Sequence, residues 1–328
     1  MHELVRGLAA AGHDVTLFAT GDSRWRDLRY VYPSPVWPPD PRAELVHCRH
    51  AVRVIAAEVF DVVHTHAPAM VALAGEVGVP FVHTLHHARD ERLTQLYHRQ
   101  PDVEYVAISA RQAELEPEVR CHVIHHGLDP ETYPLGQGGG DYAAFLGRIS
   151  PCKAPELAIT AALAAGVRIR LAGEVHLADA TPAWQQVMAA ALRWPGVQHL
   201  GRVGGKRKMR FLGDARALLM PLRWEEPFGL AMIESMLCGT PVIAFARGAA
   251  PEIVDEGLTG FLVKDAAEMA RVLGSLQRFD RIACRRRAQS RFSAARMVRE
   301  YERVYAIALG TRATAYPAGG AEESTYAG

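Results

Sequence analysis

The chain has 328 residues, of which 49% are hydrophobic and 22% charged, and its formal net charge is +1. This length favours two domains, and the composition is that of a globular protein rather than a disordered one. The near-zero charge argues against a strongly basic nucleic-acid-binding protein, and no apolar run approaches the roughly 20 residues that span a bilayer. The N-terminal residues do not resemble a signal peptide and the five cysteines form no CxxC pair, so we expect a soluble cytoplasmic protein.

Short apolar runs alternate with longer helical patterns from the start of the chain to residue 136. The predicted strands are Asp14–Ala19, Asp61–Thr65, Val79–Leu85 and Val103–Ile108, and the predicted helices are Glu3–Ala11, Leu45–Phe60, Ala67–Val77 and Arg89–Arg99. This alternation is typical of βαβ units around a parallel sheet. The glycine-rich stretch Gln137–Gly140 then predicts a flexible linker.

The same alternation restarts after the linker. The predicted strands are Asp141–Leu146, Val167–Leu171, Val197–Leu200, Ala215–Pro221, Pro241–Phe245 and Phe261–Val263, and a predicted helix, Ala154–Ala165, ends at Gly166. We therefore predict an α/β fold with two Rossmann-like doubly wound domains, residues 1–136 and 141–290, that face a cleft. An amphipathic helix over residues 293–309 should pack back on the first domain, and residues 310–328 should form a disordered tail.

The first domain opens with a helix, whereas a doubly wound domain normally begins with a strand that lies in the middle of its sheet. Without that first strand, two strands would face a gap and leave backbone groups unpaired in the core. The first strand is thus absent from the pattern. We expect either that the true start lies upstream or that the domain is defective.

Two glutamates and two cations carry the strongest chemical signal. Glu226 should lie in a strand-to-helix loop and Glu234 on the first turns of the following helix, beside loop amides that form an anion site. A carboxylate there suits the paired hydroxyls of a ribose or a hexose. Arg148 and Lys153 follow the first strand of the second domain and can converge on one diphosphate. Solvated surface side chains are the ordinary alternative for all four residues.

Together these motifs resemble glycosyltransferase family 4, whose members are retaining enzymes of the GT-B fold. The resemblance rests on the segments Arg223–Val263, Gly147–Lys153 (GRISPCK), His125–Asp129 (HHGLD), Asp61–His66 (DVVHTH) and Gly12–Thr20 (GHDVTLFAT). It implies transfer of a hexose from a nucleotide-diphosphate sugar to an unknown acceptor, with retention. It also implies that no cofactor and no obligatory metal takes part.

The resemblance also implies roles for individual residues. Arg148 and Lys153 would neutralise the donor diphosphate, and the sugar would be held by Glu226 together with the amides of Phe228, Gly229 and Leu230. Glu234 would bind the ribose, and the backbone near Arg202 and Val203 would meet the base. His86 would be the active-site histidine of the acceptor domain. Two positions depart from the family pattern, which usually has glycine at Ala154 and at Ala249. Alanine is tolerated there if the backbone is not left-handed.

Two other function classes remain open. His64 and His66 end a predicted strand close to further histidines, a pattern that also suits a zinc-dependent hydrolase. A nucleotide-sugar-binding protein with little transferase activity is the second alternative, because the first domain is incomplete. The basic run Arg281–Arg291 should be a solvated helix face or a dock for an anionic surface such as a membrane. No nucleic-acid partner is expected, since the basic runs lack interleaved aromatic residues.

Overall fold

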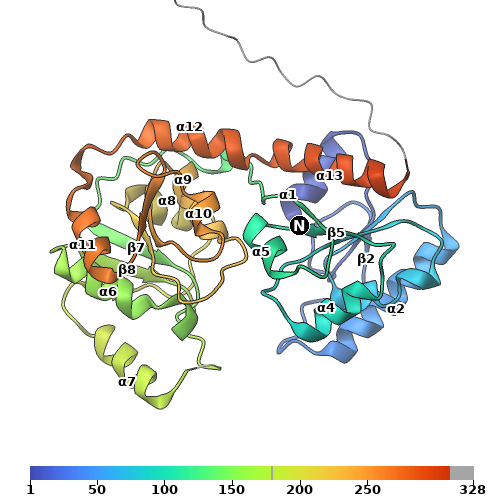
Figure 1. Cartoon of the computed structure of the whole chain (residues 1–328), viewed down its shortest axis with the longest axis horizontal. Coiled ribbons are helices and arrows are strands. Elements are labelled where there is room, and N and C mark those ends of the chain that lie inside the picture. Colours follow the sequence, from blue (N-terminus) through green and yellow to red (C-terminus); the bar gives the residue numbers. More distant parts are fainter. Residues whose placement is uncertain (179, 311–328) are drawn as a thin grey trace, which may run out of the picture.

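A computed structural model describes residues 1–178 and 180–310. The tail predicted to be disordered falls almost entirely on residues 311–328, which lie outside the described residues. Figure 1 shows two α/β units side by side, bridged along one edge by the last two helices, α12 (Arg281–Phe292) and α13 (Ala294–Ala308). All strand pairs in the described residues are parallel, which confirms the predicted fold class.

The second unit is built on a parallel sheet with the strand order β12-β11-β10-β7-β8-β9. Its strands are β7 (Tyr142–Leu146), β8 (Arg168–Ala172), β9 (Val197–His199), β10 (Leu218–Met220), β11 (Val242–Phe245) and β12 (Gly260–Val263). Its helices are α6 (Pro155–Ala164), α7 (Pro182–Ala191), α8 (Gly205–Asp214), α9 (Leu230–Leu237), α10 (Ala250–Ile253) and α11 (Ala266–Gly274). The first strand of this unit in chain order, β7, therefore lies in the middle of the sheet, between β10 and β8.

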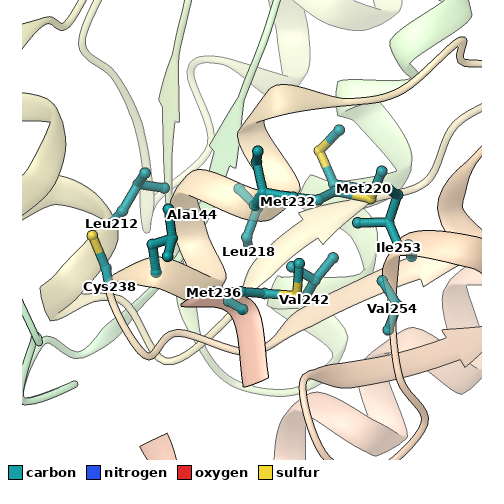
Figure 2. Close-up of a cluster of buried hydrophobic side chains, with 14 of the residues drawn as sticks. Ala144, Leu212, Leu218, Met220, Met232, Met236, Cys238, Val242, Ile253 and Val254 are labelled. Carbon is teal, nitrogen blue, oxygen red and sulfur yellow. The ribbon is translucent and has the colours of Figure 1, made fainter. Parts of the chain in front are cut away.

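Helices cover both faces of this sheet because its strands are apolar on both sides. Helices α8, α9 and α12 bury one face, where Leu212, Met232 and Met236 pack on Leu218 (Figure 2). Helices α6 and α11 bury the other face. The chain here reads as continuous apolar runs, as expected for parallel strands that are buried on both faces. This rigid core fixes the loops at the carboxyl ends of the strands.

The first unit holds a smaller sheet in the order β3-β4-β5-β6 and a separate parallel pair, β1-β2. Its strands are β1 (Leu17–Phe18), β2 (Leu28–Arg29), β3 (Val63–Thr65), β4 (Phe81–Thr84), β5 (Glu104–Ala107) and β6 (Cys121–Val123). Its helices are α1 (His2–Ala10), α2 (Pro41–Ala57), α3 (Pro68–Val71), α4 (Glu91–His98) and α5 (Ala110–Leu115). Helix α13 reaches this unit, where Met297 and Tyr301 pack with Leu4 and Val82.

Three local predictions differ from the structure. The helix predicted over Ala67–Val77 is two short pieces, α3 and a 3₁₀ turn at Ala74–Glu76, and the second piece contains Gly75, a residue type that weakens helices. Helix α2 begins earlier than predicted because the Asp40 side chain accepts the Arg42 amide at 2.9 Å and Pro41 starts the first turn. The segment Gln137–Gly140 is not a flexible linker: the amides of Gly138 and Gly140 donate to Gly213 and Asp214 in the second unit, at 3.0 and 2.8 Å.

The basic run on α12 is also different from the expectation of a solvated face. Arg281 donates to the carbonyls of Gly136, Gly213 and Ala215 at 2.7–3.1 Å, and burial lowers its pKa. Arg291 pairs with Asp255, and Arg285 donates to the carbonyl of Pro130. These arginines attach α12 to the loops around it, so most of their charge is used inside the molecule. Within residues 1–178 and 180–310, no helix combines the length and the apolar character needed to cross a bilayer.

Replacing Arg281 by alanine should lower the free energy of unfolding by about 3 kcal/mol, because part-buried carbonyls would lose their donor. Chemical denaturation measures this change. Arg286→Ala is the matched control, since Arg286 is exposed on the same helix and forms no ion pair or hydrogen bond within the described residues. Equal stability of the two variants would show that Arg281 does not stabilise this junction.

Candidate active site

A charged cluster lies at the carboxyl edge of the second sheet, in the loop that connects β10 to α9. The Lys153 ammonium contacts the Glu226 carboxylate, and the Trp224 indole N–H donates to the same carboxylate at 2.9 Å. The ammonium also lies 4.9 Å from the centre of the Trp224 ring. Glu226 is only 8% exposed, so its charge is held by these two partners rather than by water. The structure thus joins two of the predicted site residues.

The backbone around Glu226 depends on two glycines. Gly229 caps the N-terminus of α9 at a φ of +91°, which turns the chain into the helix directly after Phe228. Gly248 has a φ of +58°, and a Cβ placed there would lie 2.3 Å from the Glu226 backbone nitrogen. The next amide, of Ala249, donates to the Glu226 carbonyl at 2.9 Å. Only glycine allows the two loops to approach this closely.

Gly248→Ala should destabilise the protein and displace Glu226, whereas Gly257→Ala should only destabilise it. Both glycines have a left-handed φ, but a Cβ at Gly257 meets nothing within 4 Å. The left-handed backbone costs each alanine variant about 1–2 kcal/mol, and only Gly248→Ala adds a clash with backbone. Denaturation together with donor titration measures both effects. If the two variants bind donor equally well, the close approach does not shape the site.

Glu234 lies on the second turn of α9 and has its own partners. The Lys208 ammonium on α8 and the Tyr133 hydroxyl, at 3.0 Å, both contact Oε1 of Glu234. The Glu234 side chain is 12% exposed. Within the described residues, no hydrogen bond or ion pair joins this group to the Lys153–Glu226 pair, although both lie on or beside α9. Sequence reasoning did not predict Tyr133, and it included Lys208 only as part of the basic run Arg202–Arg210, a segment that could border the nucleotide base and phosphates.

Three other predicted residues lie at the same edge without forming a common cluster. Arg148 follows β7, is exposed, and forms no ion pair or hydrogen bond within the described residues. Arg202 follows β9, is exposed, and lies 3.7 Å from Glu174, while Val203 packs on the core. Ala154 has a left-handed φ of +50°, so the condition set for tolerating alanine is not met there, whereas Ala249 at −74° meets it.

His86 lies on the first unit and faces the second one through a row of rings. Its Nε2 lies 2.8 Å from Nδ1 of His66, and its ring stacks on His126 with centroids 5.4 Å apart. His126 in turn meets Phe228 edge-on at 5.0 Å. Two ring contacts therefore connect His86 to the turn that begins α9. The loop after β4 and the loop before α9 are brought to one place by this row.

The histidines of this row are neutral near pH 7, although His86 is exposed and His66 and His126 are half-buried. Loss of solvation lowers the pKa of His86 to about 4 and that of His126 to about 3, and it lowers the pKa of His66 further. The pKa values of His64 on β3 and His83 on β4 are each lowered to about 3 for the same reason. A neutral imidazole can accept or donate a hydrogen bond, but it does not supply a positive charge.

The histidines do not form a metal centre. His64 contacts the hydroxyls of Tyr305 and Thr84, both at 2.8 Å, and His66 contacts His86. Within the part of the chain that the structure describes, no three His, Cys, Asp or Glu side chains are grouped to hold a metal ion. The zinc hydrolase hypothesis therefore lacks the site it requires.

A second set of contacts across the two units was not predicted. The Glu252 carboxylate on α10 accepts the amides of Ala110 and Arg111 at the start of α5, at 2.8 and 3.1 Å, and it contacts His125 at 2.9 Å. Burial alone would raise the pKa of Glu252, but these hydrogen bonds together lower it below its ordinary value. Arg111 also pairs with Glu225, next to Glu226, at 2.9 Å. These contacts hold the loop of Glu226 against the first unit.

Two parallel α/β units with charged loops at their sheet edges define a GT-B-type protein, and comparison with known proteins agrees. The description "Glycosyltransferase Family 4" matches residues 1–132, and "Glycosyl transferases group 1" matches residues 140–278. The chain belongs to the family 4 glycosyltransferases. This confirms the resemblance seen in the sequence.

Individual relatives match most of the chain in sequence or in structure. D-inositol 3-phosphate glycosyltransferase of Mycobacterium avium is 29% identical over 268 residues, which is 66% of this chain and 62% of that protein. The chain thus matches less than two thirds of that relative. AviGT4, a glycosyltransferase involved in avilamycin A biosynthesis, superposes with a TM-score of 0.72 at 25% identity, covering 94% of this chain and 88% of that one. Anabaena HepE with UDP and glucose has a TM-score of 0.69 at 20% identity, covering 84% and 85%.

Proposed function

We propose that this protein transfers a hexose from a nucleotide-diphosphate sugar to an acceptor, with retention of anomeric configuration. The observation that carries the proposal is the Lys153–Glu226–Trp224 cluster at the N-terminus of α9, opposite His86. HepE, a fold relative, was solved with UDP and glucose, which supports a nucleotide-sugar donor. Residues 141–290 would bind the donor and residues 1–136 the acceptor.

The proposed roles follow from charge. Breaking the anomeric bond leaves negative charge on the nucleoside diphosphate, and Arg148 with Lys153 would stabilise that charge more in the transition state than in the ground state. Glu226 and the amides of Phe228, Gly229 and Leu230 would hold the sugar hydroxyls. Glu234 would hold the ribose, and the backbone of Arg202 and Val203 would meet the base. Glu226 is paired with Lys153 and is therefore a poor nucleophile. This favours a displacement in which the acceptor attacks the sugar from the same face that the diphosphate leaves.

His86→Ala should lower kcat at least 10-fold and leave donor affinity almost unchanged, because His86 lies on the acceptor side of the site. Steady-state kinetics and donor titration separate the two quantities. His98→Ala is the control, since His98 is exposed on α4. An unchanged kcat would remove His86 from the site.

The direct test is to incubate the purified protein with UDP-, GDP-, ADP- and dTDP-hexoses and sugar or polyol acceptors. Release of nucleoside diphosphate and the anomeric configuration of the product are read by NMR. An α-linked product from an α-linked donor supports the proposal, and an inverted product refutes retention. Tight donor binding without turnover would instead indicate the nucleotide-sugar-binding protein. If no nucleotide sugar binds or reacts, the proposal fails.

A further inference from the structure

The two oxygens of the Glu234 carboxylate have different surroundings. Oε1 contacts the Lys208 ammonium and accepts a hydrogen bond from the Tyr133 hydroxyl at 3.0 Å. Oε2 has no hydrogen-bond partner within the described residues, and it is not cut off from solvent. A carboxylate oxygen offers about two lone-pair positions, so Oε1 is filled and Oε2 is open to a ligand.

Both partners of Oε1 act as donors at neutral pH. Burial, and then the neighbouring Glu234 carboxylate, raise the pKa of Tyr133, so its hydroxyl stays protonated. Tyr133 is buried in the core of the second unit and is therefore fixed in place. Lys208 differs, because its side chain is 23% exposed and its ammonium forms no second hydrogen bond within the described residues. Of its three N–H groups, two remain for a ligand.

The position of Lys208 in the fold places it beside the proposed donor. Lys208 lies on the first turn of α8, and this helix follows directly on the loop of Arg202 and Val203. Helices α8 and α9 pack on the same face of the second sheet. The ammonium is therefore carried by the helix that begins at the loop proposed to meet the base, and it contacts the carboxylate proposed to meet the ribose.

A ribose presents two neighbouring hydroxyls, and the filled state of Oε1 limits how Glu234 can bind them. A carboxylate can hold such a pair by accepting one hydrogen bond on each of its oxygens. At Glu234 this is blocked, because Lys208 and Tyr133 already occupy Oε1. A hydroxyl oxygen also accepts hydrogen bonds, and the free N–H groups of Lys208 are donors that match it.

We propose that Lys208 is a specificity-determining residue for the donor, and that Lys208 and Glu234 divide the ribose between them. Oε2 of Glu234 accepts a hydrogen bond from one ribose hydroxyl, and the Lys208 ammonium donates to the oxygen of the other. Because both hydroxyls are bound, the donor is a sugar linked to a ribonucleoside diphosphate rather than to a 2′-deoxyribonucleoside diphosphate such as dTDP. This inference rests on the proposed function, in which Glu234 holds the ribose.

The test is calorimetric titration of the full chain with UDP, GDP and ADP and with the 2′-deoxy and 3′-deoxy forms of each. The wild type is compared with Lys208→Met and Lys206→Met. Lys206 is the matched control, because it is exposed on the same helix and forms no ion pair or hydrogen bond within the described residues. Affinity ratios between nucleotides are compared within one protein, so a partial loss of folded protein does not change them.

We expect the wild type to bind each deoxy form about 10-fold more weakly than the matching ribonucleotide, which is the usual effect of losing one hydrogen bond to a charged group. Lys206→Met should behave as the wild type does. In Lys208→Met, one of the two deoxy forms should bind as well as the ribonucleotide, since the hydroxyl that it lacks no longer has a partner. The other deoxy form should remain about 10-fold weaker, because Glu234 still reads its missing hydroxyl.

Two results would overturn this inference while the proposed function stands. The first is a wild type that binds either deoxy form as well as the ribonucleotide. The second is a Lys208→Met variant that binds all three nucleotides more weakly by the same factor, which would mean that Lys208 acts on the phosphates or on the fold. If no nucleoside diphosphate binds the wild type, the proposed function fails and this inference fails with it.

Discussion

Glu226→Gln should lower kcat/KM for transfer by about 100-fold while the affinity for the free nucleoside diphosphate changes little. The carboxylate would contact the sugar and not the diphosphate, and loss of one charge-assisted interaction in a desolvated site has about this effect. Lys153→Met should weaken binding of the nucleoside diphosphate as well, because its ammonium would meet the phosphates. Kinetics and titration of both variants check this split. Lys264→Met, an exposed lysine, serves as the control.

Stability must be separated from function in these variants. The side chains of Lys153 and Glu226 are only 13% and 10% exposed. Each single substitution therefore leaves the charge of the other residue poorly solvated and without its partner. The double variant Lys153→Met/Glu226→Gln should therefore be more stable than the sum of the single losses predicts. It should remain inactive. A double variant that regains transfer would show that the pair is structural and not part of the site.

Acidification should unfold this protein steeply below pH 6.5. His64, His83 and His126 have folded-state pKa values lowered to about 3 from an ordinary 6.5, chiefly by burial. Between pH 6.5 and 3 the unfolded chain binds more protons than the folded one. The contribution of these histidines to the free energy of unfolding is therefore fully present above pH 6.5 and is lost as the pH decreases. Each such histidine contributes about 1.4 kcal/mol per pH unit. Three give a slope of about 4 kcal/mol per unit.

Denaturant unfolding followed by circular dichroism between pH 7.5 and 5 measures this slope. His83→Asn should reduce the slope by about one proton, whatever it does to overall stability, because His83 is 1% exposed and held by the Thr65 carbonyl and the Tyr97 hydroxyl. Stability that is flat from pH 6.5 to 5 would mean that these histidines take up protons without unfolding.

Much of the fold can be predicted from the sequence because parallel strands buried on both faces appear as short apolar runs. The runs at β4, β7 and β11 are of this kind, and each lies inside the predicted range. The short edge strands β2 and β6 were not predicted, since two or three partly exposed residues give no apolar run. The start of α2 at Pro41 was missed although Asp40 and Pro41 form an ordinary start signal.

The candidate site was predicted less completely, because contacts between distant segments have no local pattern. The placement of Glu226 in a loop and of Glu234 on a helix followed from Pro227, Gly229 and the apolar run after them. That Trp224 would donate to Glu226, or that Glu252 would cap α5 from the other unit, depends on how the units face each other. The arginines of α12 were misjudged because their carbonyl partners lie as much as 155 residues away along the chain.

The central claim is that the Lys153–Glu226 cluster binds the diphosphate and the sugar of a donor. Calorimetric titration of UDP, GDP, ADP and dTDP and of their hexoses into the wild type, Lys153→Met and Glu226→Gln tests it most directly. One nucleoside diphosphate should bind the wild type and bind Lys153→Met at least 10-fold more weakly, and Glu226→Gln should lose only the added affinity due to the sugar. Donor affinities that are the same in all three proteins would contradict the claim.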